Sequence, residues 1–176
     1  MKISHCQKKI KKASSPKKGI FLQRFFKTGR GQYGYGDKFL GISVPVIRQI
    51  ADEFLGLSLN DVVKLLRSVW HEERLLALIM LTTRYDLSDP KGRAQIYKTY
   101  FSNLKYVNNW DLVDTSTPGV IGRHMFEVLG LSRSRPILTK LAKSEILWER
   151  RIAVLATFYF LRQKNFTETL RLAQML

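Results

Sequence analysis

Trp110 and Asp114 lie four residues apart, so a helix would place an aromatic ring and a carboxylate on the same face. Further along the chain, Arg150 and Arg151 stand in a stretch that is otherwise apolar. Asp114 can therefore neutralise a cation such as Arg151, or it can serve as a functional acid. The arginines can in turn hold a phosphate as readily as they pair with a carboxylate.

Three tryptophans, Trp70, Trp110 and Trp148, recur with a period of about forty residues, which in a helix-rich chain is typical of a solenoid of stacked helix pairs. Corresponding positions of a solenoid line one surface. Glu73 and Arg74 lie three and four residues after Trp70, the offsets at which Arg151 follows Trp148 and Asp114 follows Trp110. We therefore expect a carboxylate and arginine site along one surface. Packing between repeats accounts for Trp70 itself.

Other chemistry has little support in the sequence. His5, His71 and His124 share no spacing that suggests a metal site or a nucleophile and base pair. The glycines around Arg30 lack the preceding strand that a phosphate-binding loop requires. The single cysteine, Cys6, excludes an internal disulfide and a cysteine-based zinc site, and we expect it to be an exposed thiol without a catalytic role. We expect no metal and no cofactor.

The charge is strongly positive and unevenly distributed. Thirty Lys and Arg against fourteen Asp and Glu give a net charge of +16. Residues 1–36 contain Lys and Arg but no acidic residue. This asymmetry predicts a polyanionic partner, either nucleic acid or an anionic membrane surface. No apolar run approaches the roughly 18 residues of a membrane span, and the basic N-terminus lacks the apolar core of a signal peptide. We expect a cytoplasmic protein.

The elements that must position these residues are helices. Residues 1–13 are lysine-rich and expected to fray, and four glycines between Thr28 and Asp37 predict a loop. The predicted helices run from Ser15-Pro16 through Phe26, from Pro45 to Gly56, from the cap pair Ser58 and Asp61, from Trp70 through the apolar run 75–81, from Asp89-Pro90, from a cap at Asn108, from Pro136 in a first turn, from Trp148 to Leu161, and from Thr167 to Leu176.

Near Trp110, the residue Asp111 falls in the first helical turn and is expected to accept hydrogen bonds from exposed amides. Asp114 lies one turn further into the helix, too far from its start to accept hydrogen bonds from those amides. Helices that are alternately partly polar and apolar predict an all-α solenoid of HEAT-like two-layer repeats with a basic concave face. We expect a basic, mobile segment over 1–14, followed by one helical repeat domain over 15–176.

Several strings resemble one protein family. They are Phe25-Phe26-Lys27-Thr28-Gly29, residues 39–45, His71-Glu72-Glu73-Arg74, Asn109-Trp110-Asp111-Leu112-Val113-Asp114, and Trp148-Glu149-Arg150-Arg151. Together they resemble the AlkD-like family of DNA alkylation repair proteins, which are HEAT-like repeat DNA glycosylases. The resemblance covers roughly residue 15 to the end, and its Trp-Asp-x-x-Asp motif is the most specific part.

The resemblance implies hydrolysis of the N-glycosidic bond of cationic alkylpurines, such as 3-methyladenine and 7-methylguanine, in duplex DNA. It assigns the catalytic roles to Trp110 and Asp114 and a backbone phosphate to Arg151. An indole face attracts a cationic base, and a fixed carboxylate stabilises the positive charge that develops on the sugar. The family works without turning the damaged base into a pocket, unlike other glycosylases. We expect a monomer bound to phosphates of double-stranded DNA.

The sequence departs from the family at two places. A lesion-side aromatic comes from an N-terminal helix in the family, and here the glycine-rich loop 28–37 occupies that region, leaving Phe25, Tyr33 or Tyr35 as substitutes. The chain also stops at Leu176, so we expect a member shortened at the C-terminus. The additional DNA-binding cations expected are Arg150, Arg74, Lys27 and Arg30. The alternative function is a non-catalytic HEAT-like scaffold that binds nucleic acid or protein, which burial of Asp114 against Arg151 would favour.

Overall fold

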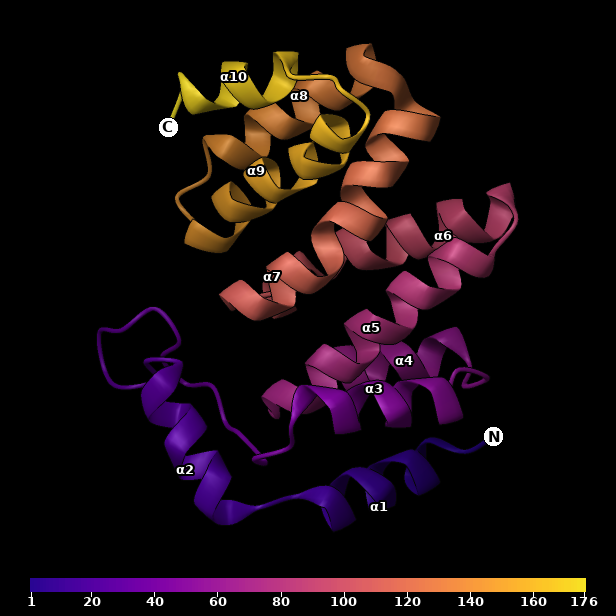
Figure 1. Cartoon of the computed structure of the whole chain (residues 1–176), viewed down its shortest axis with the longest axis vertical. Helices are drawn as coiled ribbons and strands as arrows, with labels where there is room; N and C mark the ends of the chain where they lie inside the picture. The colour runs from indigo at the N-terminus through magenta and orange to yellow at the C-terminus, as the bar shows by residue number, and fades with distance from the viewer. The chain divides into compact units, whose positions relative to one another are not determined.

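The computed structural model describes residues 1–176 and divides them into two compact units, Met1–Met80 and Leu81–Leu176. Both units are built from helices, and the only strand-like pairing is an isolated bridge between Lys38 and Trp70 (Figure 1). The predicted all-α class is therefore confirmed, and the helices fit a helical-repeat architecture. No helix is both long and apolar enough to cross a bilayer.

The first unit begins with the helices that the cap signals predicted. Ser58 Oγ accepts a hydrogen bond from Asp61 N at 3.1 Å, as expected for a cap pair. Pro16 and Pro45 each lie in a first turn. The helices are α1 (Ile3–Ala13), α2 (Pro16–Phe25), α3 (Val44–Glu53), α4 (Leu59–Leu66) and the first part of α5 (His71–Leu87).

The N-terminal segment differs from the expectation. Residues 1–14 were expected to be a mobile basic segment, yet Ile3–Ala13 form α1, which contacts α3. Cys6 and Ile10 are four residues apart, lie on one helix face and are 0% and 3% exposed. The expectation that Cys6 is exposed is therefore wrong, and burial raises the pKa of its thiol to about 12. An ion pair between Lys9 and Glu53 adds a contact to α3.

The segment after the glycine-rich loop is tied to the start of α5. The carboxylate of Glu72 accepts backbone hydrogen bonds from Leu40, Gly41 and Ile42 at 2.8, 2.7 and 3.3 Å. His71 N donates to Lys38 O at 2.8 Å. The buried carboxylate of Glu72 therefore holds the segment 40–42 against the start of α5.

The second unit contains the end of α5 and the remaining helices. As predicted, Asp89 caps a helix that begins at Pro90, and its Oδ1 accepts from Gly92 N at 2.8 Å. The helices are α6 (Pro90–Phe101), α7 (Trp110–Thr117), the π-helical turns Pro118–Gly122 and Met125–Leu129, α8 (Gly130–Ala142), α9 (Leu147–Arg162) and α10 (Thr167–Ala173).

Three helix boundaries predicted for this unit are wrong, each because of the local backbone geometry. The cap of α7 is Asn109 and not Asn108, because the Asn109 side chain accepts from Trp110 N at 2.9 Å. Pro136 lies inside α8, since the π-helical turns extend the preceding helical path beyond the point where a new helix was expected. The last helix ends at Ala173, before Leu176.

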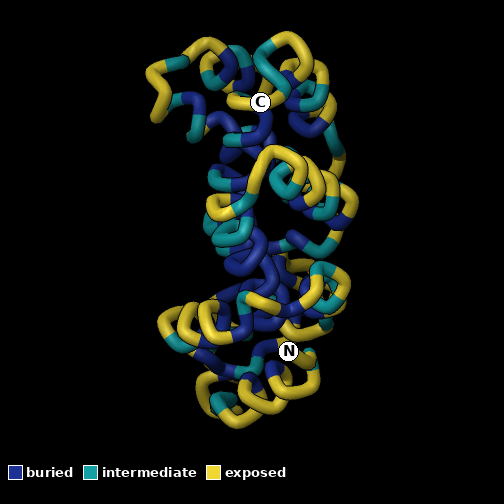
Figure 2. The backbone as a smooth tube through the Cα atoms, turned by 90° about the vertical axis from the view of Figure 1, so that its right-hand side faces the viewer, coloured by how far each residue is buried: buried dark blue, intermediate teal, exposed yellow.

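Helix α9 forms the centre of the second unit and contacts α7, α8 and α10. Its side chains Ile152, Ala156 and Phe160 are fully buried. In Figure 2 buried stretches follow the inner sides of the helices, whereas turns and outer faces are exposed. The backbone of Gly122 meets α9 so closely that a Cβ there would lie 2.2 Å from Ala156 O. This contact fixes the distance between α9 and the π-helical turn that continues α7.

Candidate active site

Asp114 and Arg151 form the centre of the candidate site. Arg151 Nε donates to Asp114 Oδ1 at 2.7 Å, and Arg151 Nη2 donates to Asp114 Oδ2 at 2.6 Å. The two side chains retain 34% and 38% exposure. Hydrogen bonding to the carboxylate raises the pKa of Arg151 above its ordinary value. The structure therefore contains the ion pair with Arg151 that was one of the two alternatives, and the paired carboxylate still faces solvent.

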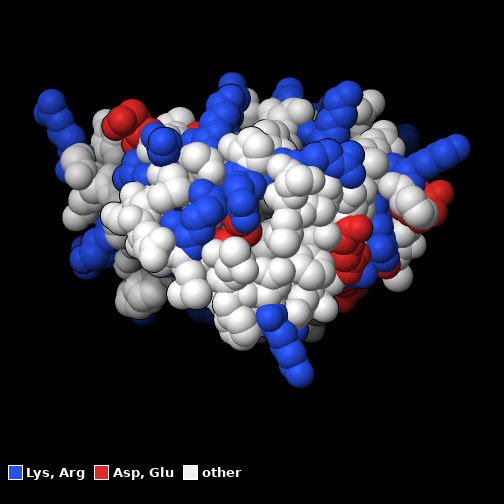
Figure 3. All heavy atoms as spheres, turned by 90° about the horizontal axis from the view of Figure 1, so that it is seen from above, with Lys and Arg blue, Asp and Glu red and all other residues white.

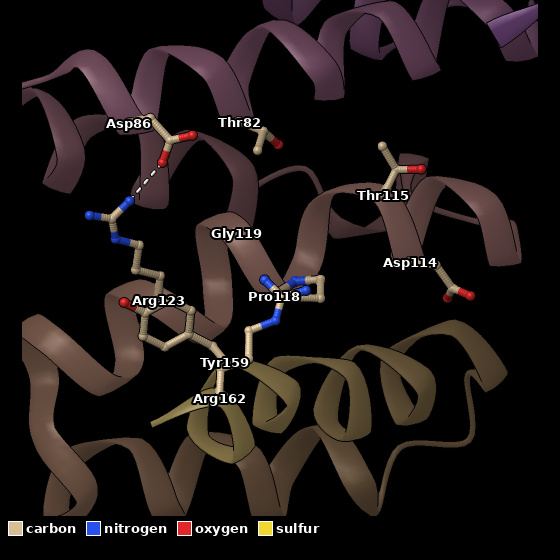
Figure 4. A pocket seen from close by; sticks show the side chains of 9 residues that line it. All are labelled: Thr82, Asp86, Asp114, Thr115, Pro118, Gly119, Arg123, Tyr159 and Arg162. Atoms are coloured by element: carbon tan, nitrogen blue, oxygen red, sulfur yellow. Dashed lines mark hydrogen bonds and ion pairs between the residues drawn. The ribbon is translucent and has the colours of Figure 1, made fainter. Parts of the chain in front are cut away.

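A cleft of about 290 Å³ opens beside this pair, between the second half of α5, the start of the first π-helical turn and α9. Figure 4 shows its wall, with Asp114 and Thr115 on α7 and Pro118 and Gly119 on the turn after it. The remaining lining residues are Thr82, Asp86, Arg123, Tyr159 and Arg162. Two carboxylates and two guanidinium groups border this cleft, so it could act on an anionic ligand and a developing cation together.

Arg123 belongs to the frame of the cleft. It donates to Asp86 Oδ1 at 2.6 Å (Figure 4). It also donates to both carboxylate oxygens of Glu127 at 3.0 and 3.1 Å. Burial opposes the ionisation of Glu127, but hydrogen bonds from Tyr159 and Arg123 hold its pKa below the ordinary range. Arg123 is thus neutralised by two acids and fixes the wall of the cleft.

Arg162 is the cation of the cleft that has no carboxylate or hydrogen-bond partner. It is exposed at the end of α9 and extends toward the turn at Pro118 and Gly119 (Figure 4). It lies eleven residues after Arg151, which is close to three helical turns at 3.6 residues each, so both arginines share one side of α9. Arg162 was not predicted from the sequence, although this spacing was available as a signal.

The other predicted residues of the second unit lie near the pair. Trp110 is half-buried one turn before Asp114 on α7. Asp111 accepts a hydrogen bond from Leu112 N at 2.9 Å, the structural role expected for it. Arg150 is half-buried, and its Nη1 donates to Ser144 O at 2.7 Å, so part of its donor capacity serves the loop before α9.

Arg74 is placed differently from the expectation. It is buried in the first unit, where its guanidinium pairs with Asp37 and donates to Ser68 O at 3.0 Å. The Asp37 carboxylate also lies 3.0 Å from His71 Nδ1. Arg74 therefore anchors the end of the glycine-rich loop to α5, and a buried, paired guanidinium is not offered to a phosphate.

The predicted residues around the glycine-rich loop are exposed. Lys27 and Arg30 project from the loop, and Phe25, Tyr33 and Tyr35 expose large parts of their rings. Lys27 adopts φ 53°, which ends α2 and turns the chain into the loop. These residues lie in the first unit, whereas Trp110, Asp114 and Arg151 lie in the second.

The surface charge agrees with the composition. On the face in Figure 3, Lys and Arg side chains clearly outnumber Asp and Glu. No group of three or more His, Cys, Asp or Glu is arranged to hold a metal ion. The site therefore contains two solvent-facing carboxylates, Asp86 and Asp114, each held by an arginine.

Comparison with family models gives a match to DNA alkylation repair enzyme over residues 6–176. Curated proteins and solved structures give no match. The matched range includes every residue of the cleft and of the pair.

Proposed function

This chain belongs to the family of DNA alkylation repair enzymes, and we propose that it is a DNA glycosylase that hydrolyses the N-glycosidic bond of cationic alkylpurines in duplex DNA. The proposed substrates are 3-methyladenine and 7-methylguanine. The observation that carries the proposal is the carboxylate of Asp114, which is fixed by Arg151 and still exposed beside an open cleft. We place the enzyme in the cytoplasm, acting on the nucleoid as a monomer.

The chemistry requires charge stabilisation more than proton transfer. An alkylpurine already carries a positive charge, so it leaves with the electrons of the glycosidic bond as a neutral base. The deoxyribose then acquires the positive charge, and water adds to its C1′ with loss of a proton. A carboxylate at the position of Asp114 stabilises the cationic sugar and orients the water. The indole of Trp110, one turn away, attracts the cationic base, with about 0.5 to 2 kcal/mol expected for a cation-π contact.

Arg151 is proposed to connect this chemistry to the DNA backbone. A guanidinium has five N–H donors, and Asp114 takes one from Nε and one from Nη2. The remaining donors, including both on Nη1, are available for a phosphate. Arg151 can therefore bind a phosphodiester while it still holds Asp114, which sets the carboxylate at a fixed place relative to the sugar.

Arg162 is proposed as a second phosphate contact. Because it shares a side of α9 with Arg151 and has no acidic partner, its charge is fully available to DNA. Phosphate contacts of this kind position a protein without reading sequence. Lys27 and Arg30 of the first unit are proposed to add to the same electrostatic binding.

The test is release of 7-methylguanine from alkylated duplex DNA by the purified chain under single-turnover conditions. Release at a rate above that of the Asp114→Asn protein supports the proposal. Binding of the same duplex without any release above the uncatalysed reaction would contradict it.

The pairing of Asp114 also supports a second candidate function, a non-catalytic nucleic-acid-binding scaffold. A carboxylate neutralised by a bidentate arginine is a common structural element. For this function, duplex binding would persist without base release, and Asp114→Asn would change neither affinity nor the products.

A further inference from the structure

A second cleft, distant in sequence from Asp114, lies within the first unit. Its volume is about 290 Å³, and its walls come from α1, from the segment after the glycine-rich loop and from the start of α5. The lining residues are Gln7, Ile10, Lys11, Leu40, Trp70 and Glu73. It contains an indole and a carboxylate three residues apart, which parallels the Trp110 and Asp114 arrangement without belonging to the site described above.

Glu73 is the unusual residue of this cleft. It is only 8% exposed, and it has neither a hydrogen bond nor an ion pair. Burial of an ionised carboxylate is costly unless its oxygens receive hydrogen bonds. The neighbouring acid Glu72 meets this requirement with three backbone N–H groups. Glu73 has no equivalent set of donors, and its oxygens, which are not among the fully buried atoms without a partner, border the cleft instead.

The surroundings of Glu73 stabilise its negative charge only in part. Its place in the first turn of α5 gives a favourable interaction with the helix dipole. Lys11 lines the same cleft but forms no ion pair with Glu73, so the nearby lysine does not satisfy the carboxylate. Its negative charge also acts on the buried thiol of Cys6, where it adds to the effect of burial in raising the pKa to about 12.

Trp70 lies beside this carboxylate and is held in place by its backbone. Trp70 N donates to Ser68 Oγ at 3.0 Å, and Trp70 O accepts from Arg74 N at 3.3 Å. Packing between repeats is the role expected for Trp70 from the sequence, and in the structure the residue also remains 36% exposed and lines the cleft. An indole and a carboxylate without a protein partner that line one cleft are the combination that recognises organic cations.

We propose that this cleft binds a small organic cation with N–H donors, an alkylammonium or a guanidinium, between the Trp70 indole and the Glu73 carboxylate. The ligand nitrogen donates hydrogen bonds to Glu73, and its charge faces the ring. The volume suits a small molecule and not a folded partner. The site is independent of the glycosylase proposal, since it uses none of the residues of the Asp114 cleft.

The experiment follows the indole N–H signal of Trp70 by NMR in the full ¹⁵N-labelled chain, with the signal assigned by Trp70→Phe. Methylguanidinium and butylammonium chlorides are titrated against sodium chloride at equal ionic strength. We expect saturable shifts of the Trp70 signal with both organic cations and none with sodium. Glu73→Gln, which keeps the shape of the side chain, should weaken binding about tenfold or more because a charge-assisted hydrogen bond is lost.

Two controls separate the site from general effects of charge and folding. Asp52→Asn removes an exposed carboxylate of the same unit and should leave binding unchanged. Lys11→Gln removes a competing cation and should tighten binding. A melting temperature for each variant checks that it is folded. Absence of saturable shifts in both the parent and Lys11→Gln would overturn the proposal. Equal binding of tetramethylammonium, which has no N–H donor, would overturn the role of Glu73 as acceptor.

Discussion

Arg151 holds Asp114 through two parallel hydrogen bonds of 2.7 and 2.6 Å while about a third of each side chain stays exposed. This geometry orients the carboxylate without closing it off. A pair this exposed contributes roughly 0 to 1 kcal/mol to folding, so its removal should affect chemistry more than stability.

Asp114→Asn keeps the shape of the side chain and removes its charge. We expect single-turnover excision to fall by on the order of 2.7 to 4 kcal/mol in activation free energy, as for other preorganised electrostatic groups. Binding to undamaged duplex should stay equal or tighten, because a negative charge near phosphates is gone. Excision and melting temperature measured on one preparation distinguish this from a structural role, in which stability drops and excision persists.

Substitution of Arg151 should separate its charge from its geometry. Arg151→Ala is expected to weaken binding to damaged and undamaged duplexes alike, since a phosphate contact carries no sequence information. Arg151→Lys keeps the charge but not the two parallel hydrogen bonds, so it should bind duplex nearly as the parent does and excise more slowly. If Arg151→Lys excises at the parental rate, orientation of Asp114 by a bidentate pair is not required.

Arg162→Gln tests the second phosphate contact. Loss of one neutralised phosphate should reduce the slope of log affinity against log salt by about 0.9. Lys140→Gln, which removes an exposed charge on α8 outside the cleft, is the matched control and should change the slope less. Equal slopes for the parent and Arg162→Gln, measured by fluorescence anisotropy on one duplex, would remove Arg162 from the interface.

His124 should make the stability depend on pH. Burial lowers the pKa of His124, whose ring stacks on Tyr97 at 4.1 Å between centroids and whose Nδ1 lies 3.0 Å from Tyr85 Oη. The unfolded chain takes up a proton near its ordinary pKa of about 6.5, and the folded chain does so only at lower pH. The contribution of neutral His124 is thus complete above about pH 6.5 and is lost as pH falls through the folded value.

The measurement is the free energy of unfolding of the parent and of His124→Gln across this range. The difference between the two proteins should shrink on acidification. An NMR titration that places the pKa of His124 at or above its ordinary value would contradict the expected direction.

Gly122→Ala should destabilise the second unit, because the new Cβ would lie 2.2 Å from Ala156 O, a backbone atom that has little freedom to move. Overpacking typically costs about 1 to 3 kcal/mol, and we expect a value at the upper end in chemical denaturation. Gly119→Ala, in the same turn, is the control, since its Cβ would meet only the Thr82 methyl at 3.0 Å. Equal stability of the two variants would show that α9 can shift away.

Local signals predicted most of the fold. Ser58 with Asp61, and Asp89 with Pro90, each satisfy helix N-termini through residues a few positions away, so the sequence alone contains the interaction. The burial of Arg74 was not predictable in this way, since its partner Asp37 is brought to it from a distant part of the chain. The assignment of Arg74 to DNA rested on its charge and its position in the repeat, neither of which reports a partner from another segment.

The candidate site was predictable to the same extent. Asp114 lies four residues after Trp110 and Arg151 three residues after Trp148, so the repeat places both near the start of a helix, and their pairing results from contact between α7 and α9. Arg162 was missed because the repeat pattern marks helix starts, while the cleft also uses a helix end. The π-helical turns leave no periodic signal, so the boundaries around Pro136 were wrong.

The turn at Pro118–Gly122 has a consequence for how the chain can vary in length. A π-helical turn holds one residue more than the α-helical path it replaces. Deleting a single residue there would return the path to ordinary α-helical geometry while α7 keeps its orientation, so Asp114 would still face Arg151. Deleting one residue between Asp114 and Pro118, within α7 itself, would instead rotate Asp114 by about 100° relative to the helices that follow, and the pair would be lost although neither residue had changed. Single-residue deletions should therefore be tolerated in the turn more often than in α7.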